Sequence, residues 1–98
     1  LSAAENANAI ITDTWISMGE NFSKDPESIF SKYRVDQKIM SIASKEVIFM
    51  HCLPAHRGQE VTADIIDGPN SVVWDEAENR LHIQKAVLTW AIANKVFT

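Results

Sequence analysis

Three short apolar runs alternate with helix-favouring segments along this chain, and this order most limits the possible folds. The runs are AIIT at 9–12, VIFM at 47–50 and SVVW at 71–74, and each has strand length. Strands that alternate with helices form right-handed β-α-β crossovers and a parallel sheet. The uninterrupted VIFM run favours burial on both faces, as in parallel sheets. We therefore predict an α/β fold in three layers, a parallel sheet with flanking helices.

Capping residues and apolar spacing predict the helices. Asp25 followed by Pro26 is typical of a helix start, as is Asp36 or Thr62 before an apolar stretch. The predicted helices cover 1–7 (the last turns of one), 26–33, 37–44, 63–67 and about 77–96. The apolar stripe of the last helix would be roughly 30 Å long at 1.5 Å per residue. That exceeds what a small sheet needs, so we expect part of it to contact a second domain or chain.

The composition excludes several classes of protein. A chain of 98 residues with 46% apolar residues can form one modest core. The net charge is −4 and no Lys/Arg cluster is present, which argues against nucleic acid as the main partner. No apolar run approaches the roughly 20 residues of a membrane span. A single cysteine and no export leader indicate a cytoplasmic location, and the start at Leu1 without Met suggests a piece of something larger.

Polar loops follow the three predicted strands, at 13–19 (DTWISMG), 51–58 (HCLPAHRG) and 75–80 (DEAENR). Because the carboxyl ends of parallel strands share one sheet edge, these loops should converge into a pocket for a small molecule. The three candidate metal ligands in the second loop, His51, Cys52 and His56, do not supply the four-ligand spacing of structural zinc. We therefore expect no metal. Taken alone, Cys52 would more often be a small buried apolar residue than a site residue.

Taken together and in this order, the three loops closely resemble the carbamoyltransferase family, and within it the ornithine carbamoyltransferases, across essentially the whole chain. The resemblance implies that residues 1–98 are the latter half of an ornithine-binding domain with a Rossmann-like doubly wound fold. It implies transfer of a carbamoyl group from carbamoyl phosphate to L-ornithine in arginine biosynthesis, without a cofactor, by a trimer or a multiple of trimers. The family's S-x-R-T and H-P-x-Q motifs, which belong to the carbamoyl phosphate domain, are absent from this sequence. The isolated chain is therefore expected to be inactive.

The resemblance also implies residue roles around the reacting amine. Asp13 and Cys52 would flank the amine of ornithine, where they orient it and assist proton removal. Ser17 and the backbone around Met18 would hold the α-amino and carboxylate ends. Gly19 would permit the sharp turn that closes this loop.

A second group of residues would bind the carbamoyl group. The backbone carbonyls of Cys52 and Leu53 would accept hydrogen bonds from its NH2 group. A fixed guanidinium suits the negative charge that develops on the carbamoyl oxygen, and Arg80 is our candidate. We expect Pro54 to stiffen the turn and His51 to support it by hydrogen bonding.

Other interpretations stay open at this point. Asp13 could simply cap its loop, and Arg80 could simply pair with Glu76 at i, i+4. A nucleophilic Cys52 is unnecessary, because the ornithine amine is itself the nucleophile. The protein could instead carbamoylate another amine such as putrescine, although the intact S-M-G segment argues against this. It could also be a catalytically silent relative that binds ornithine for regulation.

Overall fold

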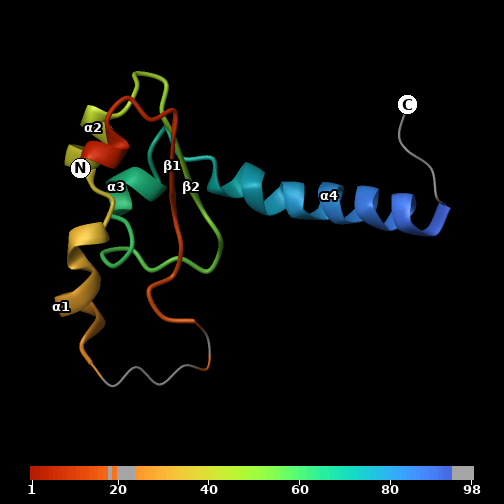
Figure 1. The fold of residues 1–98 in the computed structure, drawn as a ribbon, viewed down its shortest axis with the longest axis horizontal. Helices are drawn as coiled ribbons and strands as arrows, with labels where there is room; N and C mark the ends of the chain where they lie inside the picture. The colour runs from red at the N-terminus through yellow and green to blue at the C-terminus, as the bar shows by residue number, and fades with distance from the viewer. Residues whose placement is uncertain (18, 20–23, 94–98) are drawn as a thin grey trace.

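A computed structural model describes residues 1–17, 19 and 24–93, and its centre is a pair of parallel strands (Figure 1). Strand β1 (Ala9–Thr12) pairs with β2 (Ile48–His51). Ile10 lies opposite Phe49, and Thr12 lies opposite His51. The first two predicted strands and their parallel arrangement are confirmed, with β2 shifted by one residue. Both strands end at the same level of the sheet, so the loops that follow them start side by side.

The third predicted strand, residues 71–74, is wrong. Helix α4 (Val73–Ala93) begins inside that run, and a single parallel bridge joins Ser71 to Phe49. Phe49 N donates to Asn70 O at 2.8 Å, and Val72 N donates to Phe49 O at 3.0 Å. The segment therefore forms strand-like hydrogen bonds only at its start. Asp75 and Glu76 follow at once and favour a helix N-terminus, which explains why the helix begins before residue 77.

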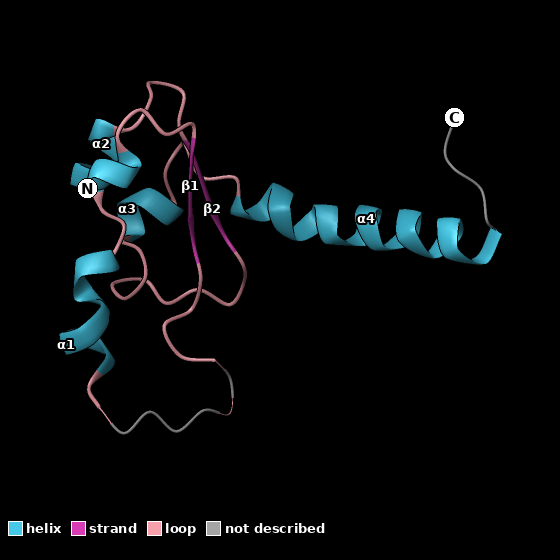
Figure 2. Ribbon diagram, in the orientation of Figure 1, coloured by secondary structure: helices cyan, strands magenta, loops and turns pink. Residues whose placement is uncertain are grey.

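Two short helices lie between β1 and β2, and a third lies between β2 and the long helix α4 (Figure 2). Asp25 caps the first, where its side chain accepts from Glu27 N at 3.2 Å, and Asp36 caps the second by accepting from Ile39 N at 3.0 Å. Thr62 precedes the third without a side-chain capping bond. Their bounds are α1 (Pro26–Phe30), followed by a 3-10 turn (Ser31–Tyr33), then α2 (Gln37–Ile42) and α3 (Ala63–Ile66). The predicted helix over 1–7 contains only the 3-10 turn Ser2–Ala4.

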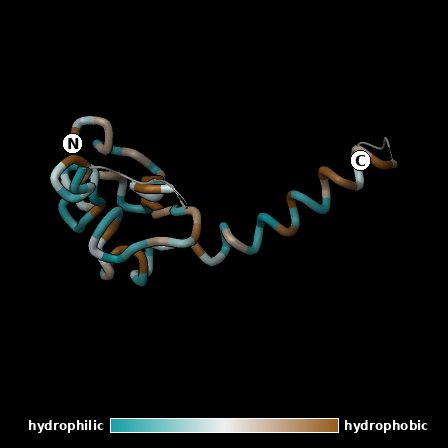
Figure 3. The backbone as a smooth tube through the Cα atoms, turned by 90° about the horizontal axis from the view of Figure 1, so that it is seen from below, coloured by the Kyte–Doolittle hydropathy of each residue, from teal (hydrophilic) through white to brown (hydrophobic). Residues whose placement is uncertain are grey.

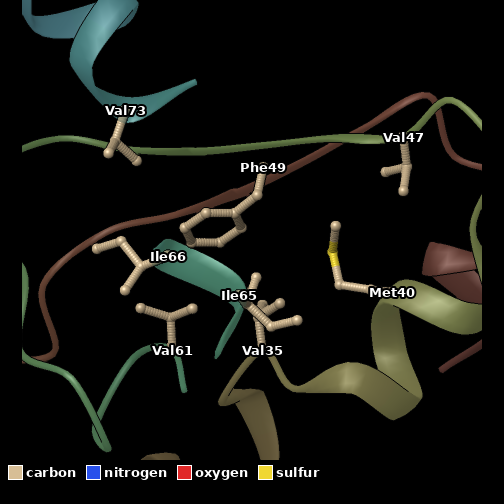
Figure 4. Close-up of a cluster of buried hydrophobic side chains, with 8 residues drawn as sticks. All are labelled: Val35, Met40, Val47, Phe49, Val61, Ile65, Ile66 and Val73. Carbon is tan, nitrogen blue, oxygen red and sulfur yellow. The ribbon is translucent and has the colours of Figure 1, made fainter. Parts of the chain in front are cut away.

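The apolar core lies between the sheet and the short helices. Figure 4 shows the Phe49 ring pointing from β2 toward Ile65 and Ile66 of α3. The buried cluster consists of Val35, Met40, Val47, Phe49, Val61, Ile65, Ile66 and Val73. On the other face of the sheet, Ile11 is 66% exposed and Ile48 is 39% exposed. The VIFM run is therefore buried on one face only in this chain, because helices of the described residues cover one face of the sheet.

Helix α4 projects away from the rest of the chain (Figure 1), and apolar and polar residues alternate along it (Figure 3). Its exposed apolar residues are Trp74, Leu81, Ile83, Val87, Leu88, Trp90 and Ile92. The accessible surface is 7464 Å², against roughly 5,600 Å² for a compact monomer of this mass. The α/β class and the long C-terminal helix are confirmed; the predicted helix end at residue 96 lies outside the described residues. That α4 contacts a second domain or chain stays a prediction.

Within residues 1–17, 19 and 24–93, no helix combines the length and the apolar character that crossing a membrane requires.

Candidate active site

The loops that follow β1 and β2 meet through a hydrogen bond between two predicted site residues. Cys52 Sγ donates to Asp13 Oδ1 at 2.9 Å. The same carboxylate oxygen accepts from Thr14 N at 2.7 Å. Thr12 and His51, which precede these two residues, are opposite each other in the sheet. The parallel register therefore brings Asp13 and Cys52 together, as the predicted strand ends require.

This hydrogen bond shifts the two pKa values in opposite directions. The bond from the Cys52 thiol, reinforced by the Thr14 amide, holds the pKa of Asp13 below its usual value. The bond to Asp13, together with burial and the carboxylate charge, raises the pKa of Cys52. At neutral pH the pair therefore consists of a carboxylate and a neutral thiol. Nucleophilic cysteines need a lowered pKa, so this geometry disfavours a thiolate nucleophile and leaves a negative charge suited to an amine.

The raised pKa of Cys52 predicts slow alkylation, although the residue is exposed. We expect iodoacetamide to modify the protein severalfold more slowly at pH 8 than it modifies an Asp13→Asn variant. The substitution removes the charge that disfavours the thiolate, so the thiolate fraction rises. The rate of carbamidomethylation by mass spectrometry measures this. Asp67→Asn, which removes an exposed carboxylate paired with Arg57, is the control. Equal rates for the parent and Asp13→Asn would contradict the assignment.

His51 supports the second loop through both its backbone and its ring. The side chain is fully buried. His51 N donates to Glu76 Oε2 at 3.0 Å, and the ring nitrogen Nδ1 contacts the carbonyl oxygen of Cys52. These contacts attach the end of β2 to the first turn of α4 and fix the Cys52 carbonyl.

Arg80 lies on the α4 side of the Cys52–Leu53 turn. A small cavity of about 110 Å³ is lined by His51, Cys52, Leu53, Glu76, Ala77 and Arg80. The Glu76 carboxylate accepts from His51 N and does not pair with Arg80. Within the described part of the chain, no ion pair or hydrogen bond holds the Arg80 guanidinium. The open alternative of an i, i+4 pair is therefore wrong, and an exposed cation faces this cavity.

Ser17 lies on the other side of the same turn. An open cleft of about 520 Å³ is lined by Thr14, Ile16, Ser17, Cys52, Leu53, Pro54, His56 and Gln59. The Leu53–Pro54 peptide is cis. Gly19 has a φ of +89°, the left-handed conformation that its predicted turn requires. Met18 lies outside the described residues. The Cys52–Leu53 turn thus borders both the Ser17 cleft and the Arg80 cavity.

Glu60 is a buried carboxylate beside the candidate site, and the sequence did not reveal its position. Its side chain is 1% exposed. It accepts from Trp15 N at 3.3 Å, from His56 N at 2.8 Å and from His56 Nδ1 at 3.1 Å. Burial raises the pKa of Glu60, but the hydrogen bonds from His56 and Trp15 outweigh this and hold it below its usual value. Nothing in the sequence distinguishes Glu60 from the other acidic residues, because its burial arises only from the packing of distant loops.

Among residues 1–17, 19 and 24–93, no group of three or more His, Cys, Asp or Glu side chains is placed to hold a metal ion.

A family comparison agrees with this arrangement of loops. Residues 1–91 match the family model described as the aspartate/ornithine carbamoyltransferase Asp/Orn binding domain. The chain belongs to the aspartate/ornithine carbamoyltransferase family. The resemblance seen in the three loops is thereby confirmed, and the α/β carbamoyltransferase fold accounts for the parallel strand pair.

Relatives named ornithine carbamoyltransferase match nearly the whole chain. One from Corynebacterium diphtheriae is 55% identical over 96 residues, which are 97% of this chain and 30% of the relative. One from Rhodopseudomonas palustris is 54% identical over 90 residues, 92% of this chain and 29% of the relative. The chain therefore spans about a third or less of these carbamoyltransferases.

Solved carbamoyltransferase structures superpose well on this chain. The ornithine carbamoyltransferase of Pyrococcus furiosus has a TM-score of 0.81 at 54% identity, covering 90% of this chain and 28% of that structure. The Campylobacter jejuni ornithine carbamoyltransferase has a TM-score of 0.84 at 40% identity, covering 96% of this chain and 31% of that structure.

Proposed function

We propose that the protein containing this chain transfers the carbamoyl group of carbamoyl phosphate to L-ornithine, giving L-citrulline and phosphate. Residues 1–98 would supply the latter half of its ornithine-binding domain. The observation that carries the proposal is the Cys52–Asp13 hydrogen bond of 2.9 Å, beside a turn that borders both the Ser17 cleft and the Arg80 cavity. Relatives that bear the name ornithine carbamoyltransferase support the same reaction.

Asp13 and Cys52 would orient the ornithine amine. An alkylamine with a pKa near 10.4 is mostly protonated at neutral pH, so the reactive form is a minor one. The ionised Asp13 accepts an N–H of the amine and stabilises the positive charge that develops on nitrogen as it attacks. Because the pKa of Asp13 is lowered, the carboxylate is a poor proton acceptor, and its main role is orientation and electrostatic stabilisation. Cys52, held as a thiol, adds no competing negative charge.

The Cys52–Leu53 turn and Arg80 would bind the carbamoyl group. The two backbone carbonyls accept hydrogen bonds from the carbamoyl NH2, and the contact from His51 Nδ1 fixes the Cys52 carbonyl. Attack by the amine forms the N–C bond and places negative charge on the carbamoyl oxygen; collapse of this centre then breaks the C–O bond to phosphate, which leaves with the proton that the amine nitrogen loses. The guanidinium of Arg80, which no described residue holds, is free to stabilise that charge.

Ser17 would bind the amino-acid end of ornithine. It lines the 520 Å³ cleft next to Cys52, so a ligand in this cleft can contact both residues. Holding the α-amino and carboxylate end of ornithine sets the distance from its side-chain amine to the carbamoyl carbon. Holding these two reacting atoms close together increases the rate.

The remaining parts of the proposal concern the whole protein. The carbamoyl phosphate domain, with its S-x-R-T and H-P-x-Q motifs, would complete the site, and the exposed apolar residues of α4 would contact that domain or another chain. We propose a trimer or a multiple of trimers that acts in the cytoplasm in arginine biosynthesis.

Substrate selectivity tests this function. We expect the full-length protein to form citrulline from carbamoyl phosphate and ornithine with kcat/KM at least about 10²-fold above that for putrescine, which lacks the carboxylate that Ser17 would help to hold. The isolated 98 residues should be inactive. Preference for putrescine would indicate another carbamoyltransferase. Ornithine binding without turnover would indicate a silent relative, and full activity of the isolated chain would contradict the two-domain site.

A further inference from the structure

The carboxylate of Glu60 lies where the two substrate loops approach each other. It is almost completely buried, and a buried carboxylate is costly unless hydrogen bonds satisfy it. Glu60 Oε1 accepts from Trp15 N at 3.3 Å and from His56 Nδ1 at 3.1 Å. Glu60 Oε2 accepts from His56 N at 2.8 Å and lies 3.8 Å from His51 Nε2. Both carboxylate oxygens are therefore in use.

These donors belong to different loops. Trp15 lies in the loop after β1, between Asp13 and Ser17, and His56 lies in the loop after β2, beyond Cys52 and Pro54. Ser17, Cys52 and His56 all line the same 520 Å³ cleft. One buried carboxylate thus joins the backbones of two segments that wall this cleft. The Cys52–Asp13 bond also joins them, but it is exposed, and hydrogen bonds to a buried charge contribute more.

Arg34 also contacts both of the segments that Glu60 joins. Its guanidinium lies 5.6 Å from the centre of the Trp15 ring, within the range of cation–π attraction. Arg34 Nε donates to Gln59 O at 2.9 Å, so the same side chain binds the residue before Glu60. Trp15 is consequently held by its backbone through Glu60 and by its ring through Arg34.

We infer that Glu60 is a positioning residue that couples the ornithine loop to the carbamoyl-binding turn. The inference rests on the proposed function. Glu60 touches no substrate in this account; it fixes the spacing between Ser17 and Cys52 by binding Trp15 and His56. A purely structural Glu60 would affect stability and leave the spacing of the two loops unchanged. A conservative substitution therefore distinguishes the two roles, because only a positioning role predicts a change in kcat/KM for ornithine in a protein that still folds.

Glu60→Gln in the full-length protein tests the coupling. Glutamine keeps the size of the side chain but replaces one acceptor oxygen with an NH2 group, which cannot accept from both loops. We expect kcat/KM for ornithine to fall roughly 10²-fold, since a misplacement of about 1 Å can cost that much. Glu60→Asp, which keeps the charge on a shorter chain, should recover part of the loss. Asp67→Asn, which breaks the exposed pair with Arg57, is the matched control and should leave kcat/KM unchanged.

Hydrogen exchange separates this inference from the proposed function. In Glu60→Gln the amides of Trp15 and His56 should both exchange faster, whereas the Ile48 amide in β2, which donates to Asn8 O, should not change. That result supports the coupling even if the parent forms no citrulline, an outcome that would overturn the proposed function alone. Unchanged exchange at Trp15, or unchanged kcat/KM in a folded and active Glu60→Gln protein, would overturn the inference. If Glu60→Gln does not fold, amide exchange and kcat/KM are measured on Glu60→Asp. Faster exchange at Trp15 with a lowered kcat/KM would support the coupling, and parent values for both would overturn it.

Discussion

Asp13→Asn in the full-length protein is expected to lower kcat for citrulline formation by roughly 10²–10³-fold, the range seen when one electrostatic stabiliser of a transition state is removed. Asparagine keeps the size of the side chain, and its Oδ1 can still accept from Cys52 and Thr14. The substitution therefore removes the charge beside the amine while preserving the loop. Affinity for carbamoyl phosphate should change little, because Asp13 acts on the amine.

Steady-state kinetics and calorimetric titration with carbamoyl phosphate measure the two effects separately. Asp67→Asn is the control, since it also neutralises an exposed aspartate in a hydrogen bond, in this case with Arg57. An Asp13→Asn protein with the kcat of the parent would show that Asp13 only caps its loop.

Arg80→Lys is expected to lower kcat/KM by roughly 10²-fold, because a lysine ammonium is a point charge and lacks the planar fork of the guanidinium. Arg80 lines the cavity beside Cys52 and Leu53, and no described residue shares its guanidinium. The substitution should therefore affect the reaction and leave the thermal midpoint nearly unchanged. Arg57→Lys, at the exposed pair with Asp67, is the matched control. Parent kinetics in Arg80→Lys would contradict the role in charge stabilisation.

The parallel strands and their converging loops were predictable because local sequence determines them. The runs at 9–12 and 47–50 are short, apolar and rich in β-branched residues, and Asp25 and Asp36 cap helices through their own side chains. The run at 71–74 misled the prediction because two influences compete there. Its apolar residues favour a strand, but Asp75 and Glu76 favour a helix start, and the helix begins at Val73.

The site was predictable where it depends on strand ends and unpredictable where it depends on burial. Asp13 and Cys52 meet because the register places Thr12 opposite His51. Glu60 acquires its partners from residues 4 and 45 positions away, and no local pattern indicates that. Glu76 likewise accepts a hydrogen bond from His51 N and does not pair with Arg80. This partner depends on where the start of α4 lies relative to the end of β2.

Direct attack by the ornithine amine is the central claim, and it can be followed with carbamoyl phosphate labelled with ¹³C in the carbamoyl carbon. The label is observed by NMR as the full-length protein turns over with ornithine. We predict that it passes from carbamoyl phosphate to the ureido carbon of citrulline, and that no carbamoyl thioester forms on Cys52 at any stage. A trapped thioester on Cys52, or no labelled citrulline, would contradict the account.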